Sequence, residues 1–454
     1  MEQTVHQENK MGTMPIPKLL FTMALPMIIS MMIQALYNIV DSMFVAQINE
    51  NALSAVSLAF PVQNLMISIV SGTCVGINAL LSRNLGEHDY KGANRVAHNA
   101  LLLALISYII FAVITVSLTD VFFKIQTSDA EICAFGHDYM TLVCGLSFGA
   151  FFVITLERLL QSTGRTHLSM ISQAVGAIFN IIFDPILIFG LLGFPKLGVA
   201  GAAIATVSGQ ILGAFISLFL NLRYNKELQF SWKAMRLHWH TIKQIYVVGI
   251  PSIIMMSIGS VMTFCFNKIL LAFTSTATAV FGVYFKLNSI FFMPVFGLNS
   301  GMVPIIAFNY GARNPKRIME TYKLSAIAAT CMMLIGISMF MFLPDKLLGL
   351  FNASANMLEI GVPALRIISI SFLFAGYCII TGSVYQALGN GTYSLIVSLA
   401  RQLFVLVPVA YFLSHAFGLQ AIWWSFPIAE IISVIASFYL FKRIYRLKIK
   451  PLEA

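Results

Sequence analysis

The chain has 454 residues, of which 58% are hydrophobic and only 10% are charged, and its formal net charge is +10. An ordinary soluble domain carries about 25% charged residues. This chain therefore cannot cover a water-facing surface, and we expect it to lie in a membrane. Its six cysteines form no CxxC pair and have no metal-ligand spacing, which excludes a disulfide scaffold and a zinc module.

Twelve apolar segments are each long enough to cross the hydrocarbon core, for which about 20 residues are needed. Charges and Gly/Pro clusters mark their ends. The polar stretch MEQTVHQENKMGTM before the first span has no short apolar core, so we expect no cleavable signal peptide. The fold predicted is an all-α polytopic membrane protein with spans at 17–47, 53–82, 95–119, 133–160, 167–191, 199–222, 243–273, 277–308, 320–343, 357–387, 392–414 and 419–441.

Lys and Arg residues are unevenly divided between alternate loops. One side of the predicted topology carries only Lys124, Lys196 and Lys346, and four residues fall inside spans, namely Lys268, Lys286, Arg366 and Arg401. The other 21 of the 28 basic residues share the side of both termini: Lys10, Lys18, Arg83, Lys91, Arg95, Arg158, Arg165, Arg223, Lys226, Lys233, Arg236, Lys243, Arg313, Lys316, Arg317, Lys323, Lys442, Arg443, Arg446, Lys448 and Lys450. Cytoplasmic loops are enriched in Lys and Arg. Both termini are therefore predicted to be cytoplasmic, in the cytoplasmic (inner) membrane. The positive charge reflects topology, and we expect no nucleic-acid partner.

The sequence also repeats itself at a constant offset of 225 residues, which falls to 220 near the end of each copy. The matches include Pro26/Pro251, Gly72/Gly297, Gly86/Gly311, Gln161/Gln386 and Gly198/Gly418. Each copy has six spans, so both enter the membrane from the same side and the repeat axis should lie along the membrane normal. The predicted units are a lobe at 1–225, a cytoplasmic linker at 226–242 and a lobe at 243–454. Two lobes about a central cavity are a transporter architecture.

Two carboxylates lie deep in the spans of the first lobe. A charge in the hydrocarbon core costs about 2.5 to 3.5 kcal/mol, so such residues usually serve function. Asp41 and Asp184 should both lie roughly 10 Å below the outer surface at a rise of about 1.5 Å per residue. Asn180 lies one turn below Asp184, and Thr206 reaches the same depth. At the repeat offset Asp41 matches Phe266, so the second lobe lacks the acid.

Oxygen ligands of this kind suit H⁺ or Na⁺, and a carboxylate in a dry site can retain a proton near neutral pH. The alternative is a hydrogen-bonded cluster that only ties helices together. A tie required by the fold should have survived in both copies, which favours a cation-coupling site. We predict that this site consists of Asp41, Asn180, Asp184 and Thr206, with Na⁺ bound at the first three if Na⁺ is the coupling ion.

Prolines interrupt three spans. Pro26, Pro185 and Pro251 each lack the amide that would bond to the preceding turn. The freed carbonyls could join an ion site. A helix kink is the interpretation favoured here for all three, and the match of Pro26 with Pro251 indicates a shared architectural role.

The second lobe has mostly basic residues at depth. Arg401 and Glu430 lie near mid-depth on adjacent spans, and we expect them to form a structural ion pair. Lys286 and Arg366 have no obvious acidic partner. A candidate substrate cavity is expected around Met31, Gln34, Tyr37, Met256 and Lys286, in which flexible methionines would give an adaptable apolar lining.

These motifs together resemble a known family, the multidrug and toxic-compound extrusion (MATE) transporters. The resemblance covers essentially the whole chain and is carried by MALPMIISMMIQALYNIVDSMFV, RNLGEHDYKGANR with its copy NYGARNPKRI, LLQSTGRTHLSMI, NIIFDPILIFGL and GVAGAAIATVSGQ. The chain is similar to the bacterial drug-efflux branch with the staphylococcal-type multidrug exporter. That resemblance implies that Asp41, Asn180, Asp184 and Thr206 couple transport to a cation. The branch with coupling acids on spans 7 and 10 is not matched, because those spans carry Lys268 and Arg366.

The function expected is a secondary antiporter that exports amphipathic, cationic organic compounds or drugs in exchange for H⁺ or Na⁺ by alternating access. We expect a monomer in the lipid bilayer, with no cofactor other than the coupling ion. A lipid-linked oligosaccharide flippase of related fold is the alternative, but its cavity should be basic in both lobes. A membrane enzyme is disfavoured because no catalytic His/Asp/Glu set is found.

Overall fold

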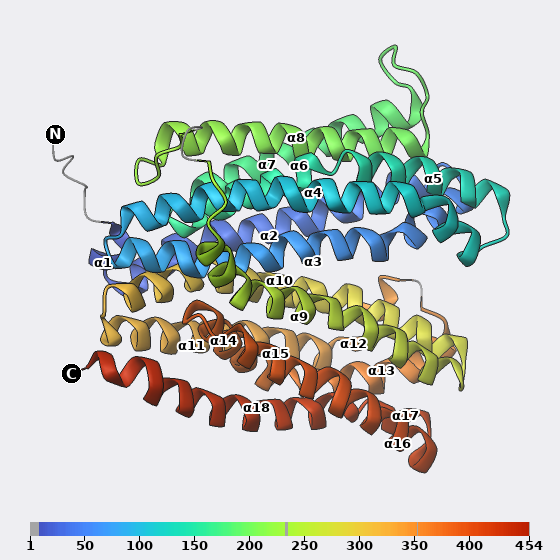
Figure 1. Ribbon diagram of the computed structural model, residues 1–454. Coiled ribbons are helices and arrows are strands. Elements are labelled where there is room, and N and C mark those ends of the chain that lie inside the picture. Colours follow the sequence, from blue (N-terminus) through green and yellow to red (C-terminus); the bar gives the residue numbers. More distant parts are fainter. Residues whose placement is uncertain (1–8, 232–234, 352, 454) are drawn as a thin grey trace.

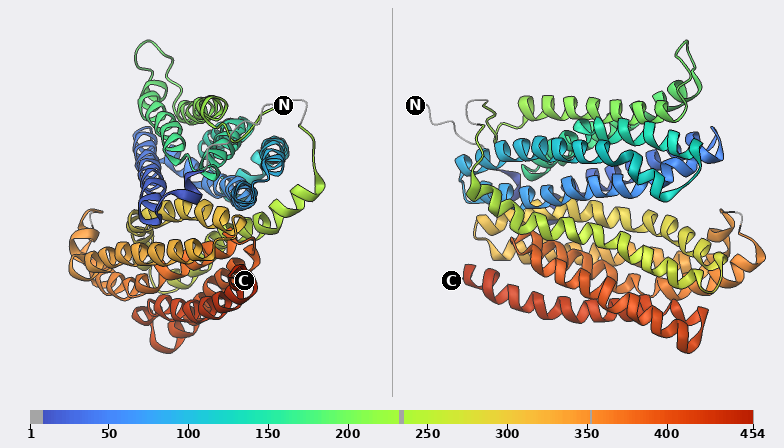
Figure 2. Two further views of the ribbon diagram at one scale, coloured as in Figure 1. Left: turned by 90° about the vertical axis from the view of Figure 1, so that its left-hand side faces the viewer. Right: turned by 45° about the vertical axis from the view of Figure 1, so that its right-hand side comes forward.

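The computed structural model describes residues 9–231, 235–351 and 353–453, and these residues form helices and connecting loops without a strand. The helices run nearly parallel in two stacked bundles, with both termini at one end (Figures 1 and 2). The first bundle contains α2 (Ile16–Ala46), α3 (Glu50–Gly86), α4 (Tyr90–Gln126), α5 (Ala130–Gly145), α6 (Phe148–Ser162), α7 (Thr166–Phe189) and α8 (Val199–Tyr224). A short helix, α1 (Lys10–Thr13), precedes it.

The second bundle repeats this arrangement. It contains α9 (Trp239–Leu271), α10 (Ser275–Gly311), α11 (Pro315–Phe342), α12 (Pro344–Gly349), α13 (Ala355–Ser369), α14 (Phe372–Ala387), α15 (Gly391–Leu399), the π-helical η2 (Ala400–Leu406), α16 (Val407–Phe417), α17 (Leu419–Ile422), α18 (Ser425–Ile444), η3 (Tyr445–Ile449) and η4 (Lys450–Leu452). Among the described residues, 10 helices are long and apolar enough to cross a membrane, and two bent helix pairs bring the number of spans to 12. The predicted fold class is confirmed.

The two bent spans are features that the sequence analysis did not anticipate. α5 and α6 meet at 42°, and α13 and α14 meet at 48°. A serine lies at each break, where Ser147 Oγ donates to the Cys144 carbonyl at 2.7 Å and Ser371 Oγ donates to the Ile368 carbonyl at 2.6 Å. A hydroxyl that donates to a backbone carbonyl in this way competes with the backbone N–H that would otherwise donate to that carbonyl in the helix. The break is therefore itself part of the repeat.

The prolines expected to kink helices lie within continuous helices. Pro26 is inside α2, Pro185 inside α7 and Pro251 inside α9. The linker is shorter than predicted, because α8 ends at Tyr224 and α9 already begins at Trp239. Within the predicted linker at 226–242, residues 232–234 lie outside the described part of the chain.

Glycines bring the two lobes into contact along matched positions. A Cβ on Gly297 would lie 2.6 Å from Ile28 Cα, and one on Gly72 would lie 2.8 Å from Ile253 Cα. Gly297 is the repeat counterpart of Gly72, and Ile253 is the counterpart of Ile28, each at the offset of 225 residues. The two contacts are therefore related by the pseudo-two-fold axis. Only glycine allows backbones to approach this closely.

The lobes are also tied together at the end that carries the termini. A Cβ on Gly86 would overlap the Phe308 carbonyl, and one on Gly311 would overlap the Arg83 carbonyl. α1 lies across this end as a strap. Arg317 Nη2 donates to the Met11 and Met14 carbonyls at 3.0 and 2.7 Å. On the other lobe, Asn9 Nδ2 donates to Glu227 Oε1 at 2.7 Å.

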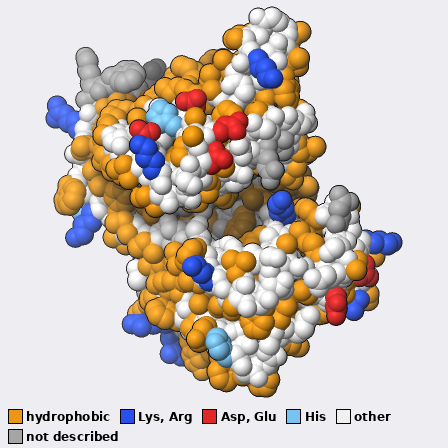
Figure 3. All heavy atoms as spheres, turned by 90° about the vertical axis from the view of Figure 1, so that its right-hand side faces the viewer, with side chains coloured by type: hydrophobic (Ala, Val, Ile, Leu, Met, Phe, Trp, Pro, Cys, Tyr) orange, Lys and Arg blue, Asp and Glu red, His pale blue; other side chains and the backbone are white. Residues whose placement is uncertain are grey.

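The opposite end is open. Beyond the contact of Ile28 with Gly297, α2 has exposed apolar side chains: Met32 by 54%, Ile39 by 54% and Met43 by 59%. Figure 3 shows this end, where a hollow separates the upper lobe from the lower. The molecule is thus closed at its terminal end and open at the other.

Candidate functional site

Asp41 and Asp184 meet inside the first lobe. Asp41 lies near the outer end of α2 and Asp184 lies on α7, where it is completely buried. The two carboxyl groups are in hydrogen-bonding contact. Asp41 Oδ1 is buried and has no hydrogen-bond partner among the described residues. The site therefore has one carboxyl oxygen free to accept a proton or a cation.

Asn180 connects the carboxyl pair to α8. With its amide oriented to satisfy both neighbours, Asn180 Nδ2 donates to Asp184 Oδ2 at 3.0 Å. Its Oδ1 then accepts from the hydroxyl of Thr206 and from the Thr206 amide, each at 3.2 Å. The structure thus brings Asp41, Asn180, Asp184 and Thr206 into one cluster inside the first lobe.

The chemistry of this cluster follows from its two acids. Two carboxylates in contact cannot both be ionised without a compensating charge, so a proton or a cation must lie with them. Carboxylate, amide and hydroxyl oxygens are also the ligands that Na⁺-sized hard cations accept. Among the described residues there is no group of three or more His, Cys, Asp and Glu side chains suited to a metal ion. The cluster thus offers oxygen atoms of the kind that bind a proton or a monovalent cation.

Two polar side chains near this cluster were missed from the sequence. Tyr139 of α5 is buried and lies within electrostatic reach of Asp41 and Asp184. Gln63 of α3 donates to the Tyr139 hydroxyl at 3.0 Å. Tyr37, which was expected to line the substrate cavity, lies within reach of the same two acids. Tyr139 directly follows the polar residues His137 and Asp138. The residues around it in the sequence therefore do not indicate that its side chain is buried.

The candidate substrate residues are divided between the lobes. Met31, Gln34 and Tyr37 lie on α2, and Gln34 Oε1 accepts from Gln173 Nε2 of α7 at 3.3 Å. Met256 lies on α9 and Lys286 on α10, both exposed. Met31, Gln34 and Tyr37 thus belong to the first lobe, and Met256 and Lys286 belong to the second.

Arg401 and Glu430 lie together in the second lobe. Arg401 Nη1 lies 3.3 Å from Glu430 Oε2 and 3.4 Å from Glu430 Oε1. Glu430 is buried on α18, and Arg401 lies in the π-helical segment η2. Such π-helical turns are uncommon and often occur at functional sites. The second lobe thus contains an Arg–Glu ion pair, whereas the first lobe contains two acids in contact.

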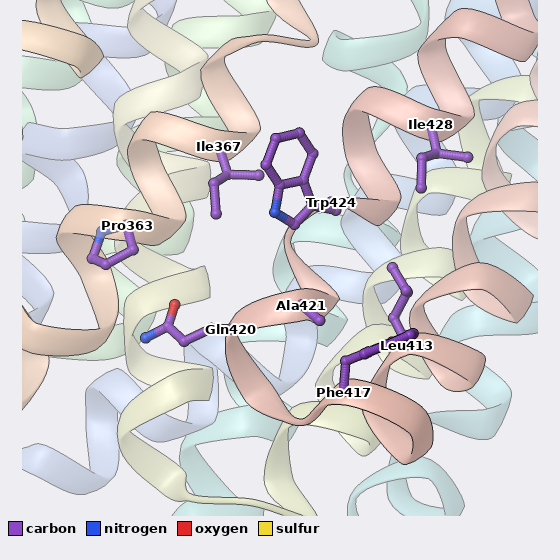
Figure 4. Close-up of a pocket in the computed structure, with 8 residues that line it drawn as sticks. All are labelled: Pro363, Ile367, Leu413, Phe417, Gln420, Ala421, Trp424 and Ile428. Atoms are coloured by element: carbon purple, nitrogen blue, oxygen red, sulfur yellow. The ribbon is translucent and has the colours of Figure 1, made fainter.

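An apolar groove of about 730 Å³ lies between α13, α16, α17 and α18. Figure 4 shows its lining, in which Gln420 is the polar side chain among Pro363, Ile367, Leu413, Phe417, Ala421, Trp424 and Ile428. Phe417 and Trp424 are exposed. A groove with this apolar lining suits lipid tails, and it contains none of the predicted site residues.

Comparison with known proteins agrees with this architecture. The family model MatE matches residues 26–186 and again residues 251–412, which reproduces the internal repeat. The multidrug export protein MepA of Staphylococcus haemolyticus is 28% identical, and the match covers 93% of this chain and 92% of that protein. The FAD transporter of Shewanella oneidensis is also 28% identical, with 95% of each chain covered.

The solved structures give the same result. An outward-facing multidrug resistance MATE family transporter of the MOP superfamily superposes with a TM-score of 0.91 over 100% of both chains, at 25% identity. Because the family model matches more than half of the chain in two copies, the chain belongs to the MatE family of membrane transporters.

Proposed function

We propose that this transporter exports amphipathic organic compounds across the cytoplasmic membrane in exchange for H⁺ or Na⁺. The observation that supports it best is the contact between the buried carboxyl groups of Asp41 and Asp184, with one Asp41 oxygen left without a partner. The multidrug export activity named for the MepA relative agrees with this proposal.

The coupling step in this proposal takes place in the first lobe. A proton or Na⁺ that enters from the open end compensates one of the two negative charges of Asp41 and Asp184 and is stabilised by Asn180 and Thr206. Neutralisation removes the repulsion between the carboxylates, so the lobe can adopt another packing. The protein then binds the cation and the substrate in alternation, as the two lobes rock about the pseudo-two-fold axis and the central cavity opens to one side of the membrane at a time. The protein works as a monomer, since one chain contains both lobes.

Transport in proteoliposomes tests this function. Purified protein is reconstituted, a pH gradient or a Na⁺ gradient is imposed, and uptake of the cationic dye rhodamine 123 is followed. We expect one of the two gradients to drive uptake, and Asp41→Asn or Asp184→Asn to reduce the driven rate at least tenfold. Asp120→Asn is the matched control, because its carboxylate is exposed on the same lobe.

Two results would contradict the proposal. Gradient-driven uptake that persists in both Asp41→Asn and Asp184→Asn would show that coupling does not depend on the acid pair. Absence of uptake under either gradient, with protein that is folded and correctly inserted, would contradict export of this class of compound.

A further inference from the structure

The contact between α2 and α10 fixes which residues face each other across the open cleft. Gly297 packs on Ile28, and Gly301 packs on Ala24. A Cβ on Gly297 would lie 2.6 Å from Ile28 Cα, and one on Gly301 would lie 2.7 Å from Ala24 Cα. A step of four residues forward on α10 thus matches four residues backward on α2, so the helices are antiparallel. The same register extends toward the open end, where the helices separate.

In this register Lys286 lies opposite Ile39. Lys286 is eleven residues from Gly297, which is about three turns of a helix at 3.6 residues per turn. It therefore lies on the face of α10 that points to the first lobe. Ile39 is 54% exposed, so the space between the two positions is not closed. Asp41 is two residues farther along α2, which places Lys286 at nearly the depth of the acid pair.

Lys286 has no acidic partner in the described part of the chain. The ion pairs found there, with a 4.0 Å limit between nitrogen and oxygen, do not include it. Its Nζ lies 5.9 Å from the centre of the Phe351 ring, and the side chain is exposed. An aromatic face stabilises an ammonium only weakly when exposed, by about 0.5 to 1 kcal/mol. The ammonium group is therefore available to an anion from the cleft.

The two lobes also differ in charge at the open end. In this half the first lobe carries Asp41, Asp120, Asp129, Glu131, Asp138 and Asp184 against Lys124 and Lys196. The second lobe carries Lys268, Lys286, Lys346, Arg366 and Arg401 against Asp345, Glu359 and Glu430. In Figure 3, acidic side chains gather on the upper lobe and basic ones border the hollow on the lower lobe. The open end of the first lobe is thus mostly acidic, and that of the second lobe is mostly basic.

We infer that Lys286 is a recognition site for an anionic group, a carboxylate or a phosphate, carried by the amphipathic substrate. The apolar or cationic part of the substrate then lies toward α2, against Met32, Ile39 and Met43, and the anionic part lies toward α10. This inference rests on the proposed transport function and narrows its substrates from amphipathic compounds in general to those that bear an anionic group.

Matched pairs of fluorescent compounds test the inference directly. Rhodamine 110 has a free carboxylate, and rhodamine 123 is its methyl ester. Flavin mononucleotide has a phosphate that riboflavin lacks. Binding and uptake of all four are measured with the wild type, Lys286→Gln, Lys286→Arg and the control Lys346→Gln, in which an exposed lysine of the short helix α12 in the same lobe is neutralised.

We expect the wild type to favour the anionic member of at least one pair. Lys286→Gln should reduce that preference about tenfold, Lys286→Arg should restore most of it, and Lys346→Gln should leave it unchanged. Loss of preference in the rhodamine pair identifies a carboxylate as the group recognised, and loss in the flavin pair identifies a phosphate.

Other outcomes overturn the inference. If Lys286→Gln lowers binding of both members of a pair equally, the lysine has only a structural role. If the wild type transports rhodamine 123 but shows no preference in either pair, anion recognition is wrong while the transport function stands. If no compound is bound or transported by folded protein, the transport function fails first, and the inference fails with it.

Discussion

Within the second lobe, the negative charge of Glu430 is compensated by the guanidinium group of Arg401. Only Nη1 of Arg401 reaches the carboxylate, at 3.3 and 3.4 Å, which is longer than the 2.7 to 2.9 Å usual for charge-assisted bonds. The Glu430 side chain is 7% exposed, so its charge has little contact with water. Loss of either partner would leave a buried charge without compensation.

We therefore expect Arg401→Met to destabilise the protein by about 3 kcal/mol, because breaking a buried pair typically costs 3 to 5 kcal/mol. Thermal unfolding of the purified protein in detergent measures the effect. The double variant Arg401→Met/Glu430→Gln should recover much of the loss, since it leaves no unpaired charge. A double variant as unstable as the sum of the single variants would show that the two side chains act independently.

That Asp41, Asp184 and Thr206 lie together could be predicted from the sequence for a physical reason. Each lies on a single continuous helix, so counting residues from the helix ends places all three at one level. Tyr139 could not be placed in this way because it lies on α5, which bends by 42° into α6. The sequence also did not indicate which faces of the helices separate at the open end, since that depends on helix rotation.

At the scale of helices, the sequence indicated the repeat and the spans because apolar length and glycine spacing are local properties. It did not indicate α1, which has only four residues and is held by contacts with both lobes. Nor did it indicate how the lobes close. That closure depends on Gly86 and Gly311, whose roles become apparent only when the carbonyls of Phe308 and Arg83 are seen opposite them.

These two glycines lead to a prediction about the conformational equilibrium. Gly86→Ala or Gly311→Ala puts a methyl group onto a carbonyl of the other lobe. Overpacking of this kind typically costs 1 to 3 kcal/mol. The cost falls only on the state that is closed at the terminal end, so the population should shift away from that state about tenfold, as 1.4 kcal/mol would produce.

Spin labels report this shift. In a cysteine-free background, labels at Leu36 and Ser289 lie on opposite walls of the cleft, and the distance between them should shorten as the open end closes. Gly282→Ala is the matched control, because a Cβ on that glycine of α10 would have no neighbour within 4 Å. Distance distributions that are the same for Gly86→Ala and Gly282→Ala would contradict a role for the glycine contacts.

At the scale of the whole molecule, a symmetric scaffold holds asymmetric chemistry. The contacts between lobes follow the two-fold axis residue by residue, as Gly72 and Gly297 show. The charged side chains do not follow it, because the acid pair lies in the first lobe, whereas Lys286 and the pair of Arg401 with Glu430 lie in the second. The scaffold thus allows the rocking motion, while the asymmetry determines which ion and which substrate each lobe can hold.

The direction of transport depends on which side of the membrane the open end faces. The 21 basic residues that share the side of the termini predict that the closed end is cytoplasmic and that the cleft opens to the outside.

Single cysteines at Lys316 and Lys346 test this orientation in intact cells, after the six native cysteines are replaced. Both positions are exposed, one beside the first turn of α11 and the other in α12 at the opposite end. A membrane-impermeant maleimide should label the cysteine at position 346 from outside and should reach position 316 only after the membrane is permeabilised. The reverse pattern would mean that the cleft opens to the cytoplasm, so that the structure would represent the state that loads substrate rather than the state that releases it.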